Sequence, residues 1–170
     1  IKFRLKEQDS LPALAIGIND LGGTGYYSGE YIVSSYAHNN FDFHLGLGWG
    51  NLNHFNHFKN PLSIISDKFD NRGSELGKGG TFNIDDFFSG QNASIFAGIN
   101  YALNDNYVLK LEYDPLVTPG KVGYDDRNSD LSVGLVYLDK NYVLGANLER
   151  GSTFSFNISL RDDFFIPERK

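Results

Sequence analysis

A strict alternation of apolar and polar residues constrains this chain most, and the segment 41–50, FDFHLGLGWG, carries it without interruption. Phe41 and Trp49 fall on one face of this segment, whereas Asp42 and His44 fall on the other. A period of two residues is that of a β-strand with one apolar and one polar face. In a soluble sandwich the apolar face would cover a protein core. In a membrane barrel it would face lipid, as we expect here for Phe41 and Trp49, while the polar face lines a lumen.

The alternation returns along the whole chain, so we expect about nine antiparallel strands, most of them long enough for the roughly 9–11 residues that a tilted membrane strand needs. A helical period is missing apart from a turn predicted near residues 84–89. The strand segments are residues 1–6, 13–18, 27–34, 41–50, 92–101, 107–113, 131–137, 142–149 and 153–161.

Two of these segments depart from the strict pattern. In the segment 27–34 we expect Tyr31 on the apolar face and Glu30 on the polar face, so that Ile32 interrupts the alternation. Phe96 interrupts its own segment in the same way, because it falls among polar-face positions.

The connections between the segments alternate between tight turns and longer loops. In an up-and-down meander, alternate connections lie on the same side of the sheet, so one rim would carry the tight turns and the other rim the loops. Outer-membrane barrels have this asymmetry, whereas a soluble sandwich has no reason to sort its loops. The tight turns are residues 7–10, 39–40, 104–106 and 139–141; the longer connections are residues 20–25, 51–91 and 114–130, and the last connection is the short segment 150–152.

Composition excludes several classes of protein. A net charge of −6 leaves no basic stripe for nucleic acid. The absence of cysteine excludes a disulfide, a thiolate nucleophile and a cysteine-based zinc site. No run approaches the roughly 18 apolar residues of a membrane helix. Aromatic residues make up 15% of the chain and glycines number 19, which together favour a β architecture with many turns.

Aromatic residues gather at the ends of the predicted strands, while the strand middles are aliphatic or glycine. Girdles of amphipathic rings at both interfaces are expected of a surface that faces lipid. A preference of aromatic residues for strands in general would also produce part of this pattern. The residues concerned are Tyr27, Phe41, Trp49, Tyr101, Tyr107, Tyr113, Tyr137 and Tyr142.

The polar face collects charges of both signs together with serine, asparagine and glycine. In a soluble core each of these charges would need a partner, at a cost of several kcal/mol. A hydrated lumen or a carbohydrate-compatible surface accommodates them, as would a face in water. The candidates for a lumen-facing position are Lys2, Arg4, Glu30, Asp42, His44, Lys110, Glu112, Asn147, Glu149, Asn157 and Arg161.

Motifs that suggest bound phosphate or metal are weak. The segment Gly73–Thr81, GSELGKGGT, resembles a phosphate-binding loop, but its glycine spacing is too short and Gly79 follows the lysine where serine or threonine is required. His54 and His57 stand three residues apart, but no third ligand is placed with them. We therefore expect no metal and no cofactor.

Three acidic pairs, Asp85-Asp86, 125–126 and 162–163, could supply the two carboxylates that glycoside hydrolysis requires. Capping of a helical turn or simple solvation explains them better, because the first pair stands directly before two phenylalanines. We therefore expect no enzyme.

Several segments resemble the YjbH/GfcD-type family of outer-membrane β-barrel proteins of Gram-negative bacteria, which are linked to exopolysaccharide and group 4 capsule production. The resemblance covers nearly the whole chain in order, and its motifs are strings of turn and strand residues without a catalytic signature. It implies a role in moving or anchoring exopolysaccharide at the outer membrane. The segments are residues 15–36, 41–50, 79–101, 109–114, 133–137 and 148–161.

The expected fold is therefore all-β: residues 1–170 form one antiparallel, up-and-down transmembrane β-barrel or, since single-chain bacterial barrels use even strand numbers, a section of about nine strands of a larger one. Expected partners are outer-membrane lipid, polysaccharide, further barrel strands and periplasmic export proteins. A soluble all-β carbohydrate-binding module is the alternative. The loop 51–91 is a candidate plug or gate, with Phe82, Asp85, Asp86, Phe87 and Phe88 as gate residues.

Overall fold

A computed structural model describes residues 1–23, 25, 27–73, 84–114 and 128–160. In this part of the chain the backbone forms β-strands and four short 3₁₀ turns, and no helix there is long and apolar enough to cross a membrane. The strands are β1 (Lys2–Lys6), β2 (Ala13–Asn19), β3 (Gly29–His38), β4 (Phe41–Gly48), β5 (Phe58–Lys59), β6 (Asn92–Ala102), β7 (Tyr107–Tyr113), β8 (Leu131–Leu138), β9 (Tyr142–Glu149) and β10 (Thr153–Leu160).

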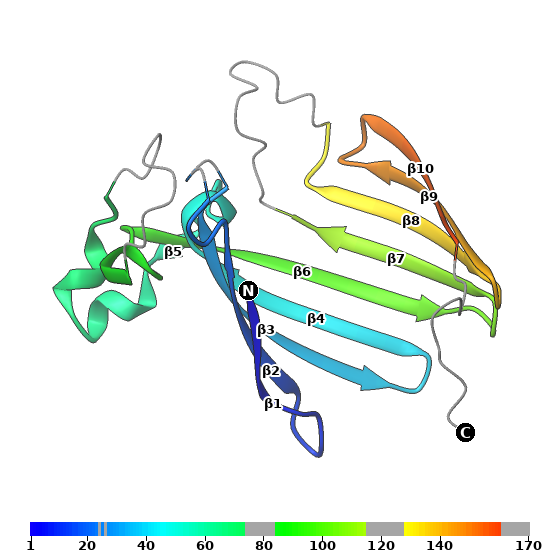
Figure 1. Ribbon diagram of the computed structural model, residues 1–170, viewed down its shortest axis with the longest axis horizontal. Helices are drawn as coiled ribbons and strands as arrows, with labels where there is room; N and C mark the ends of the chain where they lie inside the picture. Colours follow the sequence, from blue (N-terminus) through cyan, green and yellow to red (C-terminus); the bar gives the residue numbers. More distant parts are fainter. Residues whose placement is uncertain (24, 26, 74–83, 115–127, 161–170) are drawn as a thin grey trace, which may run out of the picture.

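All of the strands belong to one open antiparallel sheet in the order β1-β2-β3-β4-β6-β7-β8-β9-β10, and the short strand β5 pairs with the start of β6. The expected all-β meander and its nine main strands are confirmed, whereas β5 was not predicted. The sheet is strongly curved, and β1 and β10 form its two edges (Figure 1).

The connections are sorted between the two ends of the sheet, as the sequence predicts. The tight turns β3–β4, β6–β7 and β8–β9 lie together at one end, and the long β4–β6 connection lies at the other (Figure 1). Asn39 in the β3–β4 turn has a φ of +52°, a left-handed conformation that asparagine tolerates well. We refer to the two ends as the tight-turn rim and the long-loop rim.

The register separates the sheet into two chemically different faces, because directly paired residues of neighbouring strands point to the same side. One row runs from Asp42 through Asn100, Lys110 and Gly134 to Asn147, and it contains polar residues and glycine only. The adjacent rows on the other side hold mainly leucine, isoleucine, valine and aromatic residues. We call these sides the polar face and the apolar face.

Large apolar side chains lie on the surface rather than in a core. Among the described residues the buried hydrophobic side chains are those of Ala15, Val33, Trp49 and Ala93. By contrast, the larger strand residues of the apolar face are exposed, as with Leu45 at 58%. The small residues of the polar face are mostly buried, which indicates that this face is the concave side of the curved sheet.

Pairing also corrects the expected orientation of β3. Ile32 pairs with Ile16 and Leu47 and therefore lies on the apolar face. Tyr31 lies on the polar face, because it pairs with Gly17 and Gly48. The expected assignment of this strand was inverted, since β3 carries apolar residues on both faces and only its neighbours decide the register.

Candidate functional site

The connection between β4 and β6 folds at the long-loop rim into what we call the rim cluster, formed by residues 49–73 and 84–91. It consists of β5 and four 3₁₀ turns joined by irregular backbone. The turn predicted near residues 84–89 is confirmed as the last of these. The 3₁₀ turns are η1 (Gly50–Leu52), η2 (Pro61–Ile64), η3 (Asp67–Asp70) and η4 (Ile84–Asp86).

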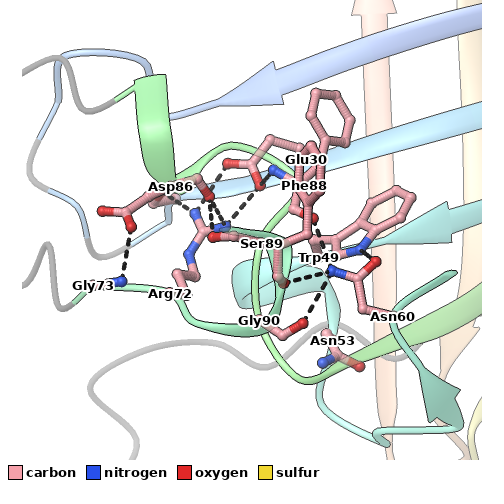
Figure 2. Close-up of polar contacts among 12 residues, drawn as sticks. Glu30, Trp49, Asn53, Asn60, Arg72, Gly73, Asp86, Phe88, Ser89 and Gly90 are labelled. Atoms are coloured by element: carbon pink, nitrogen blue, oxygen red, sulfur yellow. Dashed lines mark hydrogen bonds and ion pairs between the residues drawn. The ribbon is translucent and has the colours of Figure 1, made fainter. Parts of the chain in front are cut away.

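A buried ion pair joins the rim cluster to the sheet (Figure 2). Arg72 Nη1 donates to Glu30 Oε2 at 2.7 Å, and Arg72 Nη2 donates to Glu30 Oε1 at 2.9 Å. The backbone N–H of Phe88 donates to the same Oε2 at 2.9 Å. Glu30 is fully buried, so these three charge-assisted bonds replace the water that its carboxylate loses.

Glu30 does not belong to the polar face, so grouping it with the lumen-facing candidates was wrong. It pairs with Ile18 on β2, and the backbone N–H of Trp49 donates to its carbonyl at 2.9 Å. Glu30 and Trp49 are therefore opposite each other on the apolar side of the sheet at the long-loop rim. A carboxylate is tolerated there because the rim cluster covers it and supplies Arg72.

Arg72 also ties together segments that are distant in the sequence. Its Nη2 donates to Ser28 Oγ at 2.8 Å, and its Nη1 donates to the carbonyl of Asp86 at 3.1 Å. Asp86, one of the predicted gate residues, accepts a bond from the Gly73 N–H at 2.8 Å through Oδ1. The Arg72 guanidinium thus links Glu30 of β3 to the backbone at Asp86, and the Asp86 carboxylate in turn holds the backbone at Gly73.

Trp49 is fully buried, so the expectation that it faces lipid was wrong. The chain leaves the strand after Gly48 and the rim cluster closes over the indole. Its Nε1 donates to Asn60 Oδ1 at 3.0 Å, and its ring meets the ring of Phe88 edge-on at 5.3 Å. Phe88, another predicted gate residue, thereby helps to hold the rim cluster together (Figure 2).

Asn60 organises the backbone around the indole. Its Nδ2 lies 2.9–3.0 Å from three carbonyl oxygens, those of Phe69, Phe88 and Gly90. Its Oδ1 also accepts the N–H of Leu62, which starts the turn η2. Most buried polar groups of the rim cluster are satisfied in this way, with Asp70 Oδ1 as an exception, and this indicates a preformed structure rather than a loose loop.

The remaining gate candidates take no part in these contacts. Asp85 is exposed and Phe87 is half-buried, and Phe82 lies outside the described residues. Of the acidic pairs, 125–126 and 162–163 also lie outside the described part of the chain, as does most of the phosphate-loop-like segment 73–81.

The two histidines of the rim cluster have structural contacts. The backbone N–H of Ile95 donates to His57 Nδ1 at 3.0 Å, so the ring proton lies on Nε2, which contacts the Tyr113 hydroxyl at 2.9 Å. The ring of Phe55 contacts the rings of both His54 and His57, with centroids 5.3 and 5.4 Å away. No group of three metal-ligating side chains occurs among the described residues.

On the polar face, hydrogen bonds connect several of the predicted lumen-facing residues. His44 Nδ1 lies 2.9 Å from Ser35 Oγ, and its Nε2 lies 3.5 Å from Asn100 Nδ2. Lys110 and Glu112 form an ion pair at 2.9 Å. The expectation that His44 belongs to a hydrogen-bonded network on the polar face is confirmed.

The register brings most of the lumen-facing candidates to one face. Only Glu30 among the described candidates lies on the other side, and Arg161 is outside the described residues. The candidates that share the polar face are Lys2, Arg4, Asp42, His44, Lys110, Glu112, Asn147, Glu149 and Asn157.

Sequence reasoning missed three residues that organise the two regions. The sequence around Arg72 contains no pattern that predicts its role, because its partner carboxylate lies 42 positions away in the chain. Tyr31 and Phe96 did give one, since they are the aromatic residues involved where the alternation becomes irregular. Their rings contact each other on the polar face, with centroids 6.0 Å apart.

Comparisons with known proteins agree on one family. The model of the family YjbH, described as exopolysaccharide biosynthesis protein YbjH, matches residues 1–168. The chain is 38% identical over 168 residues to the lipoprotein YjbH of Escherichia coli strain K12, a match that covers 96% of this chain and 24% of that protein. The chain thus spans about a quarter of this relative. No solved structure matches it significantly.

Proposed function

The chain belongs to the YjbH family of exopolysaccharide biosynthesis proteins, and from this premise we propose that it forms a section of an outer-membrane β-barrel that takes part in the export or surface anchoring of exopolysaccharide. The observation that carries the proposal is the exposed apolar face of the sheet. The relative's description as a lipoprotein is consistent with a place in the Gram-negative envelope.

The apolar face is too large and continuous to be left in water. Its exposed side chains extend from Phe3 on β1 to Phe156 on β10, and Phe156 is 79% exposed. Apolar surface in water costs roughly 25 cal/mol per Å², and monomeric soluble proteins rarely expose contiguous patches above a few hundred Å². Lipid removes this cost, while the polar face remains hydrated.

An aromatic band along the tight-turn rim supports a membrane interface there. On the apolar face the rings of Phe41 and Tyr101 stack at 4.5 Å, and Tyr107, Tyr137 and Tyr142 follow one another at 5.0 and 5.9 Å. Amphipathic rings favour the headgroup level of a bilayer. A strand of eight residues is about 26 Å long, which at a tilt near 40° spans roughly 20 Å, close to the apolar band of such barrels.

The sheet is open, so the proposal requires further strands at its edges. β1 and β10 each pair with a single neighbour in the described part of the chain. An exposed edge would aggregate in water and could not exist unpaired in lipid. We infer that strands from the rest of the protein, or from another chain, complete the wall, and that periplasmic export proteins meet its tight-turn rim.

We propose that the polar face contacts a hydrated glycan without covalent chemistry. Its hydroxyl, amide, imidazole and charged groups can exchange hydrogen bonds with sugar hydroxyls as a chain moves past. Of the paired carboxylates, Asp86 is bonded to the Gly73 N–H, which gives it a role in holding the rim cluster. Replacing Asp85 and Asp86 with asparagine is therefore expected to leave export intact.

The rim cluster remains the candidate gate, with a sharper definition. Because Arg72 and the N–H of Phe88 bind the buried carboxylate of Glu30 on β3, movement of the whole cluster would require breaking several buried bonds. Deleting residues 51–91 and measuring conductance in lipid bilayers tests the gate. An unchanged current would contradict the role of the rim cluster as a gate, but it would not contradict the proposal that the sheet forms part of a barrel wall.

The proposal as a whole is tested with the full-length protein in a strain that secretes exopolysaccharide. We expect the protein to fractionate with the outer membrane, to need detergent for extraction, and to show a heat-dependent shift in electrophoretic mobility. Deleting its gene is expected to lower secreted but not intracellular polysaccharide. Recovery in solution without detergent would instead favour the soluble carbohydrate-binding module.

A further inference from the structure

Two aromatic side chains depart from the chemistry of the polar face. Among the phenylalanine, tyrosine and tryptophan residues of the described strands, only Tyr31 of β3 and Phe96 of β6 lie on the polar face. They lie toward the long-loop rim, and both are half-buried. Neither is needed to cover a core, because the large apolar residues of this sheet lie on the opposite face.

Each ring lies across a glycine of a neighbouring strand. A Cβ atom on Gly46 would fall on the ring of Phe96, nearest to Cζ and equally far from the two Cε atoms. This geometry means that the face of the ring, and not its edge, covers the glycine. The ring of Tyr31 lies over Gly17 in a similar way. No other residue type would leave room for the rings at these two positions.

The two rings form the walls of a corner. Their centroids are 6.0 Å apart and their planes meet at 82°, so they stand almost at right angles. Since one face of each ring rests on a glycine, the opposite faces are turned toward the space on the polar side. Aromatic faces that lie on backbone are held in one orientation, which lowers the entropy lost when a ligand stacks on them.

A row of hydrogen-bonding groups borders this corner. The row of Ser35, His44 and Gly98 lies two residues along the strands from the row that contains Gly46 and Phe96. Rows on one face separated by two residues are about 6.6–7 Å apart, which is close to the length of one sugar ring. The His44 imidazole is held by Ser35 at 2.9 Å, next to Asn100.

We propose that Tyr31 and Phe96, together with His44 in the adjacent row, form a subsite that binds a pyranose unit of a polysaccharide. A pyranose presents an apolar C–H face, which stacks on aromatic rings, and a rim of hydroxyls, which bond to imidazole, amide and hydroxyl groups. The inference rests on the proposed function, and it assigns the glycan contact to defined residues of the polar face.

The competing explanation is structural. Aromatic rings that cover glycines in neighbouring strands can serve only to shield the backbone and fix the register. Leucine at positions 31 and 96 would still cover the glycines but could not stack on sugar. A test with leucine therefore separates the two roles.

The experiment uses the full-length protein in detergent and, as probe, oligosaccharides obtained by partial acid hydrolysis of the exopolysaccharide that wild-type cells secrete. The test variant is Tyr31→Leu/Phe96→Leu. The matched control is Tyr36→Leu/Tyr101→Leu, which removes one ring from each of the same strands on the apolar face. Binding is measured by calorimetry, and saturation-transfer NMR reports contact between aromatic protons and sugar C–H groups.

We expect the test variant to bind about tenfold more weakly and to lose the saturation transfer, while the control keeps both. The single variants Tyr31→Leu and Phe96→Leu should each bind more weakly than the wild type, and they test the subsite even if the double leucine variant fails to fold.

Equal binding by the leucine variant, equal weakening by the control, or no binding by the wild type would each overturn the subsite. Gene deletion and membrane extraction judge the proposed function separately. If secretion depends on the protein but the wild type binds none of the oligosaccharides, only the subsite fails. If the protein is soluble without detergent and deletion leaves secretion unchanged, the proposed function fails as well.

Discussion

The sheet and the rim cluster bury opposite kinds of residue. On the sheet, side chains such as Leu45 and Phe156 are 58% and 79% exposed, and the residues withdrawn from the surface are mostly small. In the rim cluster, Trp49 is fully buried, and polar groups such as Asn60 are buried with it and fully hydrogen-bonded. Both regions belong to one chain, but they solve the problem of apolar surface in different ways.

This difference teaches which surroundings each region requires. The rim cluster buries Trp49 and satisfies most of its polar groups by its own contacts and by Glu30 of β3, so it can exist in water. The sheet leaves its apolar face uncovered and therefore needs an apolar partner, which we propose is lipid. Perturbations should accordingly act on the two regions independently.

The largest expected effect comes from Arg72→Ala. It leaves the buried carboxylate of Glu30 with only the N–H of Phe88, and removing one partner of a buried ion pair costs about 3–5 kcal/mol. Amide hydrogen exchange should accelerate throughout the rim cluster but not in the ladder between β7 and β8.

The matched control for this variant is Glu30→Leu/Arg72→Met, which replaces both charges with apolar groups. Such replacements of buried ion pairs are often neutral, so we expect most of the protection to return. Faster exchange in β7 and β8 as well, or a double variant no better protected than Arg72→Ala, would contradict the independence of the two regions.

The next effect concerns the two faces of the sheet. Leu135 and Val136 are neighbours on β8, but the first lies on the apolar face and the second on the polar face. If the apolar face meets lipid, Leu135→Lys should destabilise the folded, membrane-inserted protein by about 2–4 kcal/mol, whereas Val136→Lys should have little effect.

The measurement is the fraction of full-length protein that inserts into liposomes in the heat-modifiable form, for each of the two lysine variants at the same denaturant concentrations. Equal losses for both variants would mean that neither face contacts lipid selectively. The opposite order would mean that the polar face is the one turned outward.

The comparison of the two regions also explains what could be predicted from the sequence. The strands and the loop sorting follow from local pattern, because a period of two residues and turn-forming residues specify them within a few positions. The face of residues such as Lys110 followed for the same reason. Only β3 was assigned to the wrong faces, since Tyr31, Ile32 and Val33 are all apolar and pairing with β2 and β4 decides between them.

The rim cluster could not be predicted in the same way. The burial of Glu30 and Trp49 is produced by residues far along the chain, and Arg72 lies 42 positions from Glu30. In isolation, a glutamate on an alternating strand indicates a hydrated face, and a tryptophan at a strand end indicates an interfacial ring. Both interpretations failed because tertiary contacts, which have no local period, supply the partners.

A smaller effect is expected from Trp49→Phe, which keeps an aromatic ring near Phe88 but removes the N–H that Asn60 accepts. Loss of one buried hydrogen bond should destabilise the rim cluster by about 1–2 kcal/mol. The control is Tyr27→Phe, because the side chain of Tyr27 is exposed and its hydroxyl can be lost at almost no cost. Hydrogen exchange of residues 58–70 measures the stability of the rim cluster in both variants. Equal protection in the two variants would mean that the hydrogen bond from Trp49 to Asn60 does not stabilise the rim cluster.

The smallest effect lies at the β1–β2 turn, outside both regions. The side-chain bond from Lys6, at 2.7 Å, and the N–H of Leu11 hold the pKa of Asp9 below its ordinary value. Because the folded-state pKa is lowered, the contact stabilises the turn above the unfolded pKa of an aspartate and loses this effect as pH falls through the lower, folded value. In Asp9→Asn, the amide hydrogen exchange of the β1–β2 turn should therefore lose the acceleration that acid causes in the wild type. Protection from exchange in the rim cluster and on β8 should stay the same. NMR titration of the Asp9 carboxyl measures the shift directly, and a midpoint at or above that of an unstructured aspartate would contradict it.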